Sequence, residues 1–342
     1  MKALMFRAIG ELSYEEVPDP KIERPDEVLV RIRAVGICGS DVHGYLGHTG
    51  RRIPPMIMGH EASGDVVAVG SAVTKFRPGD RVALFPMQVC GECFNCHAGS
   101  PNICLQRQLL GAGTTMKGAL AEYIAWPEKS IFPIPDGLSY ENAALAEPTA
   151  VSAHGVNRGQ IEPGNSALIV GVGTIGLLAL ACARAKSPGR VFVSDVSEDR
   201  LAVARQWGAD AALNPKREDV VQIVKEQTGG AGVDRAFEAV GNSAAALQSI
   251  RATRSGGLVV WIGNAQKMIE IDMQEIVTRE LTVRGTYAFT DRDFVEAIGL
   301  LADGKVPVGK LIGLRGTLAE GPAIFAELSR NLNILKAVLL LD

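Results

Sequence analysis

The first third of the chain alternates short apolar runs with clusters of turn-forming residues. The segments EVLVRIRAVGI, ASGDVVAVG and DRVALF are rich in Val, Ile and Ala, and Gly, Pro and Asp residues separate them. Short β-prone runs bounded by such residues are typical of strands in an all-β unit. This part of the chain is therefore predicted to form a compact, β-rich barrel.

From about residue 150 the pattern changes to an alternation of apolar strand-like runs with longer helix-like segments. SALIVG is followed by TIGLLALACARA and RVFVSD by SEDRLAVARQWG, and the series continues through VDRAFEAVG and GGLVVWIG. This alternation is typical of βαβ units, whose strands form a parallel sheet. The predicted fold class is therefore α/β, with a doubly wound parallel-sheet (Rossmann) domain.

The last part of the chain does not extend this series. After ELTVRGTY come a helix-like DFVEAIGLLADG, a strand-like LIGLRG, another helix and the apolar ILKAVLLL. We assign these pieces to the first domain. Residues 1–150 and 286–342 are then predicted to form the β-rich domain, and residues 151–285 a dinucleotide-binding domain inserted in it. The cleft between two such domains is the natural ligand site.

Composition and charge narrow the function classes. The 342 residues are 47% hydrophobic, which is enough for two domains with sizeable cores. The 35 basic and 38 acidic residues are spread along the chain and give a formal net charge of -3, so no basic patch points to nucleic acid or to an acidic membrane. We expect a small, roughly neutral substrate, and neither a nucleic-acid nor a membrane partner.

The N-terminal MKALMFRAIGELSYEE turns polar too soon for a secretory signal, so we expect a cytoplasmic protein. One uncharged stretch, residues 163–183, has a length that could cross a bilayer. It contains three glycines in its middle part and fits a buried strand, a turn and a helix better than a single spanning helix.

Four of the six cysteines, Cys90, Cys93, Cys96 and Cys104, fall within fifteen residues. The spacing CxxCxxCx7C lets a tight loop present four thiolates to one tetrahedral centre, as in a closed structural zinc site. An iron–sulfur cluster fits less well, because its common run places the fourth cysteine closer and before a proline. We predict a structural zinc lobe at about residues 88–106.

A second group of metal-binding residue types lies upstream. The segments GICGSDVH, residues 36–43, and MGHEASGDVVAVG, residues 58–70, place a cysteine, a histidine and a glutamate at element ends. With the cysteine lobe, these segments resemble the zinc signatures of the medium-chain alcohol dehydrogenases, most closely those of sorbitol and other polyol dehydrogenases. The resemblance covers nearly the whole chain. It implies a GroES-like catalytic domain and a homo-oligomer, either a tetramer or a dimer.

The resemblance implies that Cys38 and His60 ligate a catalytic zinc that keeps one position open for an alcohol. The third protein ligand stays open between two glutamates. Glu147, in AEPTAVSAH, stands where alcohol dehydrogenases have a cysteine and the polyol branch has a glutamate that ligates directly or through water. Glu61, beside His60, is the competing carboxylate.

Proton transfer is predicted for residues near these ligands. Asp41 is placed to accept a hydrogen bond from His60 and to fix its tautomer. Ser40 and His43 suit a relay that carries the proton of the bound alcohol towards solvent, while hydride passes directly to the nicotinamide. The predicted catalytic residues are Ser40, His43 and Glu61.

The motif GVGTIG, residues 171–176, lies between an apolar strand and a helix, the context that a dinucleotide fingerprint requires. The backbone can approach a pyrophosphate there, and the helix N-terminus supplies amide donors. The carboxylate of Asp195 can accept from both ribose hydroxyls and would repel a 2′-phosphate, which predicts NAD. Arg200 either stacks on the adenine or faces solvent. The predicted cofactor-binding residues are Gly171, Gly173, Thr174, Ile175, Gly176, Asp195 and Arg200.

These patterns together predict NAD-dependent, zinc-assisted oxidation of a secondary alcohol of a hexitol, pentitol or polyol phosphate to the ketose, with two zinc ions per subunit. Threonine 3-dehydrogenase and butanediol dehydrogenase use similar zinc signatures and remain alternatives. A zinc-stabilised binding protein without catalysis is the alternative from a different class, but it has no need of Ser40 and His43 beside Cys38. Ala288 stands where sorbitol dehydrogenases have an arginine, so the particular polyol stays open.

Overall fold

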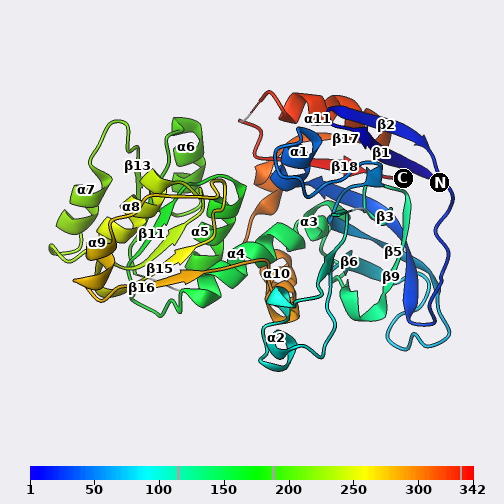
Figure 1. The fold of residues 1–342 in the computed structure, drawn as a ribbon, viewed down its shortest axis with the longest axis horizontal. Helices are drawn as coiled ribbons and strands as arrows, with labels where there is room; N and C mark the ends of the chain where they lie inside the picture. Colours follow the sequence, from blue (N-terminus) through cyan, green and yellow to red (C-terminus); the bar gives the residue numbers. More distant parts are fainter. Residues whose placement is uncertain (114–115, 187–188, 332) are drawn as a thin grey trace. The chain divides into compact units, whose positions relative to one another are not determined.

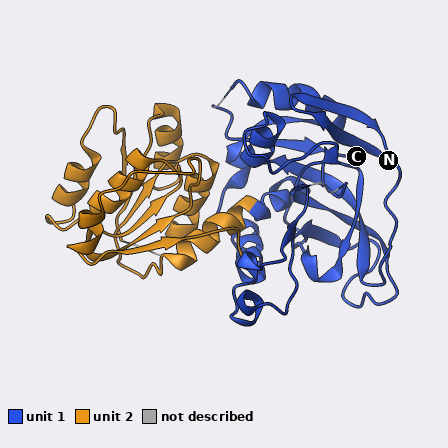
Figure 2. Ribbon diagram, in the orientation of Figure 1, with its two compact units in different colours: residues 1–147, 290–342 blue, residues 148–289 orange. Residues whose placement is uncertain are grey.

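The computed structural model describes residues 1–113, 116–186, 189–331 and 333–342 (Figure 1). The chain divides into two compact units, shown in different colours in Figure 2. Unit 1 comprises Met1–Glu147 and Thr290–Asp342, and unit 2 comprises Pro148–Phe289. Unit 2 is therefore inserted in the sequence of unit 1.

Unit 1 is built on a seven-stranded sheet in the order β10-β6-β5-β3-β18-β17, with β9 also pairing with β3. A three-stranded sheet has the order β2-β1-β4. Buried side chains of both sheets form one core. The β-rich domain that the sequence predicts is confirmed. The strands are β1 (Lys2–Ala8), β2 (Glu11–Glu16), β3 (Glu27–Ile37), β4 (Met56–Ile57), β5 (Glu61–Val69), β6 (Arg81–Leu84), β9 (Tyr123–Pro127), β10 (Ile131–Pro133), β17 (Ile312–Thr317) and β18 (Lys336–Leu340).

Two strand pairings position the chemistry of unit 1. Strand β5 is antiparallel to β3, with Glu61 opposite Gly36, and β18 is antiparallel to β3 on its other side, with Ala337 opposite Ile37. The end of β3 therefore meets the start of β5 and the start of β18 at one end of the sheet. Segments far apart in the sequence come together at this point.

Short elements complete unit 1. A two-stranded ladder of β7 (Met87–Gln88) and β8 (Gln108–Leu109) flanks the cysteine lobe. The helices are α1 (Gly39–Tyr45), α2 (Phe94–His97), α3 (Tyr140–Ala144), the start of α4 (Ala146–Arg158), α10 (Asp291–Ala302) and α11 (Gly321–Leu328), with 3-10 turns η1 (Pro101–Ile103), η2 (Glu128–Ser130), η3 (Val308–Leu311) and η4 (Leu318–Glu320). The C-terminal segments belong to unit 1.

Unit 2 is a six-stranded parallel sheet in the order β13-β12-β11-β14-β15-β16. From β11 the chain forms β12 and then β13 on one side of this strand. It then returns to the middle of the sheet and forms β14, β15 and β16 on the other side, which is the doubly wound topology. All residues of β11 and β12 are buried, so both faces of the sheet are covered. The predicted α/β fold class is confirmed. The strands are β11 (Ala167–Val170), β12 (Val191–Ser194), β13 (Ala211–Leu213), β14 (Val233–Glu238), β15 (Thr253–Trp261) and β16 (Thr282–Gly285).

The helices of unit 2 are α5 (Thr174–Ala185), α6 (Glu198–Gln206), α7 (Val220–Glu226), α8 (Ser243–Ala252) and α9 (Met273–Val277), together with most of α4. The uncharged stretch 163–183 forms β11, the glycine-rich turn and most of α5. In the described part of the chain, no helix has the length and apolar character needed to span a membrane.

Candidate active site

Four thiols gather in the cysteine lobe of unit 1. The Sγ atoms of Cys90, Cys93, Cys96 and Cys104 lie within 4.8 Å of one another. The Sγ atoms of Cys104 and Cys90 are 3.4 Å apart, and those of Cys93 and Cys96 are 3.6 Å apart. A tetrahedron of Zn–S bonds of about 2.3 Å has edges of about 3.8 Å. The spacing of the four sulfurs fits a zinc ion.

The four neighbouring thiols change one another's ionisation. Backbone N–H groups, that of Leu105 first, hold the pKa of Cys93 at about 6. Burial and the neighbouring thiols raise the pKa of Cys96 to about 12. Four thiolates so close together would need a positive ion between them, and an ion that used all four donors would have no open position for a substrate.

A second group joins Cys38, His60 and Glu61, whose ligand atoms also lie within 4.8 Å of one another. Cys38 follows β3 and caps α1, where its Sγ accepts a hydrogen bond from the Ser40 N–H at 3.5 Å. His60 immediately precedes β5. The two motif segments meet because β3 and β5 are antiparallel neighbours.

Asp41 lies behind His60. Its Oδ2 is 3.4 Å from Nδ1 of His60, and both side chains are buried. Burial opposes ionisation, but the charges of His60 and Arg52 outweigh it and lower the pKa of Asp41 to about 2. Burial likewise lowers the pKa of His60, yet Asp41 and Cys38 raise it well above its usual value. Nδ1 of His60 faces Asp41, so Nε2 on the other side of the ring is placed to bind a metal. The negative charge of Asp41 favours a cation at this site.

Glu61 is fully buried and ion-paired. Lys336, at the start of β18, donates from Nζ to the two Glu61 oxygens at 2.7 and 2.9 Å and to the Ile37 carbonyl at 3.3 Å. The sequence reasoning missed Lys336. Its signal is a lysine at the head of the apolar run KAVLLL, where a buried strand leaves no room for an unpaired charge.

Glu147 lies in the first turn of α4 and is 7% exposed. Burial raises the pKa of its carboxyl to about 7, a change that the charge of Glu61 reinforces and that of His60 opposes. Among the described residues it does not belong to the group formed by Cys38, His60 and Glu61. A carboxylate oxygen of Glu61 thus lies within 4.8 Å of the ligand atoms of Cys38 and His60, and the carboxylate of Glu147 lies outside this group.

The two residues predicted to form a proton relay both lie on α1. Ser40 Oγ donates to Cys38 Sγ at 3.3 Å and accepts from Arg52 Nη2 at 3.0 Å. His43 is in the last turn, exposed, with its ring 5.9 Å from that of His48. Ser40 therefore adjoins the group formed by Cys38, His60 and Glu61, and His43 is the member of the pair that solvent reaches. The sequence reasoning did not single out Arg52.

The glycine-rich turn of unit 2 joins β11 to α5. A Cβ on Gly176 would lie 1.8 Å from the carbonyl oxygen of Gly171, so this close packing of helix on turn requires glycine. Thr174 and Ile175 form the first turn of α5, and Gly173 is its N-cap, so no side chain caps the N–H groups at the start of this helix. The local geometry is that of an anion-binding helix start.

Asp195 follows β12 and is buried beside this turn. Its Oδ2 accepts from the Val172 N–H at 2.8 Å and its Oδ1 from the Ser197 N–H at 2.9 Å. Nη1 of Arg200 is 3.9 Å from the position that a Cβ on Gly173 would take. Both predicted side chains therefore lie next to the glycine-rich turn.

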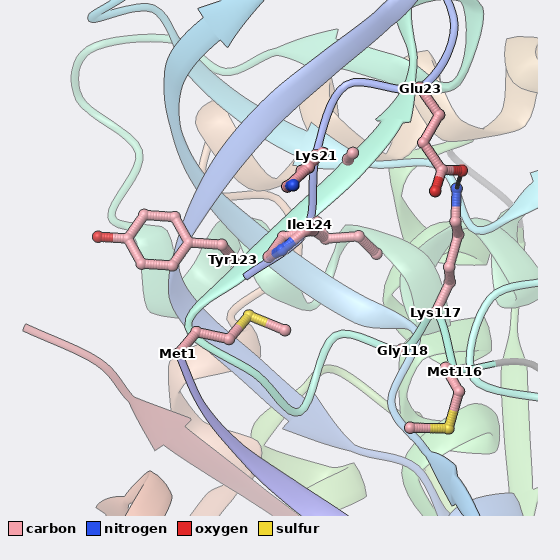
Figure 3. A pocket seen from close by; sticks show the side chains of 10 residues that line it. Met1, Lys21, Glu23, Met116, Lys117, Gly118, Tyr123 and Ile124 are labelled. Atoms are coloured by element: carbon pink, nitrogen blue, oxygen red, sulfur yellow. Dashed lines mark ion pairs between the residues drawn. The ribbon is translucent and has the colours of Figure 1, made fainter. Parts of the chain in front are cut away.

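A separate surface hollow of unit 1 is shown in Figure 3. Lys117 and Glu23 form an ion pair at 3.7 Å across one side of it, and Met1 and Tyr123 line the other. Its volume is about 80 Å³, and it contains none of the residues that the sequence predicts for chemistry. We assign no function to it.

Two family models match the chain. Residues 24–136 match the alcohol dehydrogenase GroES-like domain, and residues 174–303 match the zinc-binding dehydrogenase domain. The sorbitol dehydrogenase of Bacillus subtilis is 38% identical over 316 residues, which cover 91% of this chain and 89% of that protein.

Solved structures agree with this assignment. Galactitol-1-phosphate dehydrogenase from Escherichia coli matches with a TM-score of 0.94 and 28% identity over 100% of both chains. The 2R,3R-butanediol dehydrogenase from Bacillus subtilis matches with a TM-score of 0.91 and 31% identity, over 100% of this chain and 99% of that one.

Proposed function

Because the chain belongs to the zinc-dependent medium-chain alcohol dehydrogenases, we propose that it oxidises a secondary alcohol of a polyol to a ketone with NAD as hydride acceptor. The family and the enzyme class that the motifs predict are confirmed. The observation that carries the proposal is the convergence of Cys38 and His60 beside the hydroxyl of Ser40.

We assign different roles to the two metal-binding groups. The four-thiol lobe holds a structural zinc, since all its donors are occupied. Cys38 and His60 hold the catalytic zinc, and Glu147 is the third ligand, direct or through water. Lys336 already satisfies both oxygens of Glu61, whereas no hydrogen bond or ion pair of the Glu147 carboxylate occurs among the described residues.

The choice between the two glutamates is testable by metal analysis. Glu147→Gln should lose catalytic zinc to a chelator faster than Glu61→Gln, because it removes a ligand rather than the partner of Lys336. Zinc content is measured during dialysis, with the lobe zinc as internal standard. Faster loss from Glu61→Gln would instead make Glu61 the ligand.

Zinc bound at Cys38 and His60 would supply Lewis-acid activation of the alcohol. The chain's own residues do the rest. Asp41 fixes the orientation of His60. Ser40 accepts the alcohol proton at Oγ as its own hydroxyl hydrogen moves on towards His43, which is exposed and releases a proton to solvent. Unit 2, residues 148–289, is the dinucleotide-binding domain, and residues 1–147 and 290–342 form the catalytic domain.

NAD preference rests on Asp195. Its carboxylate is fixed by two backbone N–H groups beside the glycine-rich turn, where ribose hydroxyls would donate to it and a 2′-phosphate would be repelled. Asp195→Asn keeps the shape and removes the charge. We expect the ratio of kcat/KM for NADP to that for NAD to rise by about tenfold or more. An unchanged ratio would remove Asp195 from cofactor selection.

The polyol assignment is supported by relatives named for sorbitol and galactitol 1-phosphate. The relative named for 2R,3R-butanediol keeps a small diol as the second candidate. The experiment is a panel of hexitols, pentitols, polyol phosphates, 2,3-butanediol and threonine with NAD and purified enzyme. Cys38→Ser should abolish turnover while the fold persists. No NAD reduction with any compound, or full activity of Cys38→Ser, would overturn the proposal.

We also propose a homo-oligomer and a cytoplasmic location. Strand β16 is at the edge of the unit 2 sheet, and nearby Met268, Met273 and Val277 are 64–82% exposed. Such an edge can pair with a second copy, giving a dimer or a tetramer. Size-exclusion chromatography with light scattering tests this. The clustered free thiols favour a reducing compartment.

A further inference from the structure

Arg52 is a buried arginine that touches two residues of the site at once. Its side chain is 3% exposed. Nε and Nη2 donate to Oδ1 of Asp41 at 3.0 and 2.7 Å, and Nη2 also donates to Oγ of Ser40 at 3.0 Å. One guanidinium therefore links the carboxylate behind His60 to the hydroxyl of the relay.

The path of this side chain is shaped by its surroundings. A Cβ on Gly44 of α1 would lie 2.4 Å from Cγ of Arg52, so glycine leaves the space through which the arginine reaches inwards. The backbone on both sides is held: the Gly113 N–H donates to the Arg51 carbonyl at 2.9 Å, and the Ile53 N–H donates to the Gly113 carbonyl at 3.1 Å. The arginine is thus fixed at its base and at its tip.

The hydrogen-bond capacity of Ser40 gives this contact a chemical meaning. A hydroxyl has one hydrogen and two lone pairs. Arg52 occupies one lone pair, and the hydrogen points to Cys38 Sγ at 3.3 Å. One lone pair remains to accept a hydrogen bond from an alcohol, and when the alcohol proton moves to Oγ the hydroxyl releases its own hydrogen towards His43 and solvent. Since a guanidinium stays protonated, Arg52 cannot take that proton itself, and its charge favours the negative charge that develops on the alcohol oxygen as the proton leaves.

The two oxygens of Asp41 have different partners. Arg52 occupies Oδ1, which leaves Oδ2 facing Nδ1 of His60. The orientation of the histidine and the orientation of the relay hydroxyl therefore depend on the same side chain.

Building on the proposed function, we propose that Arg52 is a positioning residue that aligns Ser40 for proton transfer and Asp41 for support of His60. A purely structural ion pair would affect stability alone. A positioning residue affects kcat, the isotope effect of proton transfer and the retention of the metal.

The test compares zinc-loaded Arg52→Met and Arg52→Lys with wild type on the best substrate of the panel. In Arg52→Met we expect kcat to fall about 100-fold with the alcohol KM within about threefold, and the solvent deuterium isotope effect on kcat to rise. Zinc should pass to a chelator about tenfold faster. Arg52→Lys, which keeps the charge but cannot fork to both acceptors, should recover part of kcat. The matched control is Arg51→Met, a neighbouring exposed arginine, which should behave as wild type.

A double variant separates alignment of Ser40 from general damage. In a Ser40→Ala background, replacement of Arg52 by lysine should cost much less than it does in wild type, because the group that it aligns is gone. Equal losses in both backgrounds would overturn the proposal. So would wild-type kcat and isotope effect in a folded Arg52→Lys, which decides the matter even if Arg52→Met does not fold. A wild type inactive on the whole panel would instead refute the proposed function.

Discussion

In Lys336→Met, the buried carboxylate of Glu61 loses the ammonium group that neutralises it. In wild type the two groups are 2.7 Å apart and their side chains are 3% and 0% exposed. Burial lowers the pKa of Lys336, but Glu61 and Cys38 outweigh it and raise the pKa above its ordinary value. The Lys336 ammonium group therefore stays charged over the acid and neutral range and loses its charge only at alkaline pH.

The expected loss at pH 7 is about 3–4 kcal/mol. Breaking one side of a buried ion pair typically costs about 3–5 kcal/mol. This loss of stability has an upper limit, because in the variant the buried carboxyl can take up a proton instead of staying charged. Keeping an ordinary glutamic acid protonated at pH 7 costs about 3.7 kcal/mol. For a unit of the size of unit 1, this is a fall in Tm of about 10 °C. At pH 5.5 the same limit is only about 1.6 kcal/mol.

The assay is differential scanning calorimetry of the zinc-loaded protein at both pH values, with Lys336→Met/Glu61→Gln as the matched control. The double variant carries no buried charge at this position, so it should recover more than half of the loss. A Tm of Lys336→Met within about 2 °C of wild type at pH 7 would refute the reasoning. Equal losses at both pH values, or equal losses in the single and double variants, would do the same.

Three further variants test other parts of the structure. Cys93→Ser should reduce the zinc content from two ions to one and lower the Tm, measured by metal analysis and calorimetry, and an unchanged zinc content would contradict the lobe assignment. Burial opposes ionisation of Asp234, but hydrogen bonds from Arg254 and Ser166 lower its pKa, so its stabilisation is present at neutral pH and is lost as pH falls below about 4. Asp234→Asn should therefore cost about 1–2 kcal/mol in urea unfolding at pH 7 and less at pH 3; equal costs would count against this account. Ala288 has φ +51°, so Ala288→Gly should raise the stability of unit 2 by up to about 1 kcal/mol, and a clear loss would show that the alanine side chain contributes to packing.

Features that depend on local order were predictable from the sequence. Cys90 to Cys104 fall in one loop, so their spacing alone brings four thiols together. The glycine-rich motif sits between a strand and a helix, and the strand–helix alternation around it predicts the parallel sheet. In each case, the residues that act together are close neighbours in the chain, and short-range geometry limits where they can go.

The surroundings of the catalytic group were decided only by the tertiary structure. Lys336 is 275 residues from Glu61 in sequence, and they meet because β18 and β5 both pair with β3. A shift of one residue in either pairing would turn a side chain to the opposite face of the sheet. No spacing rule relates such positions. The ion pair of Glu61 with Lys336 therefore follows from strand register. The hydrogen bond from Arg52 to Ser40 follows from the packing of segments that are separate in the sequence, and the sequence pattern alone predicts neither contact.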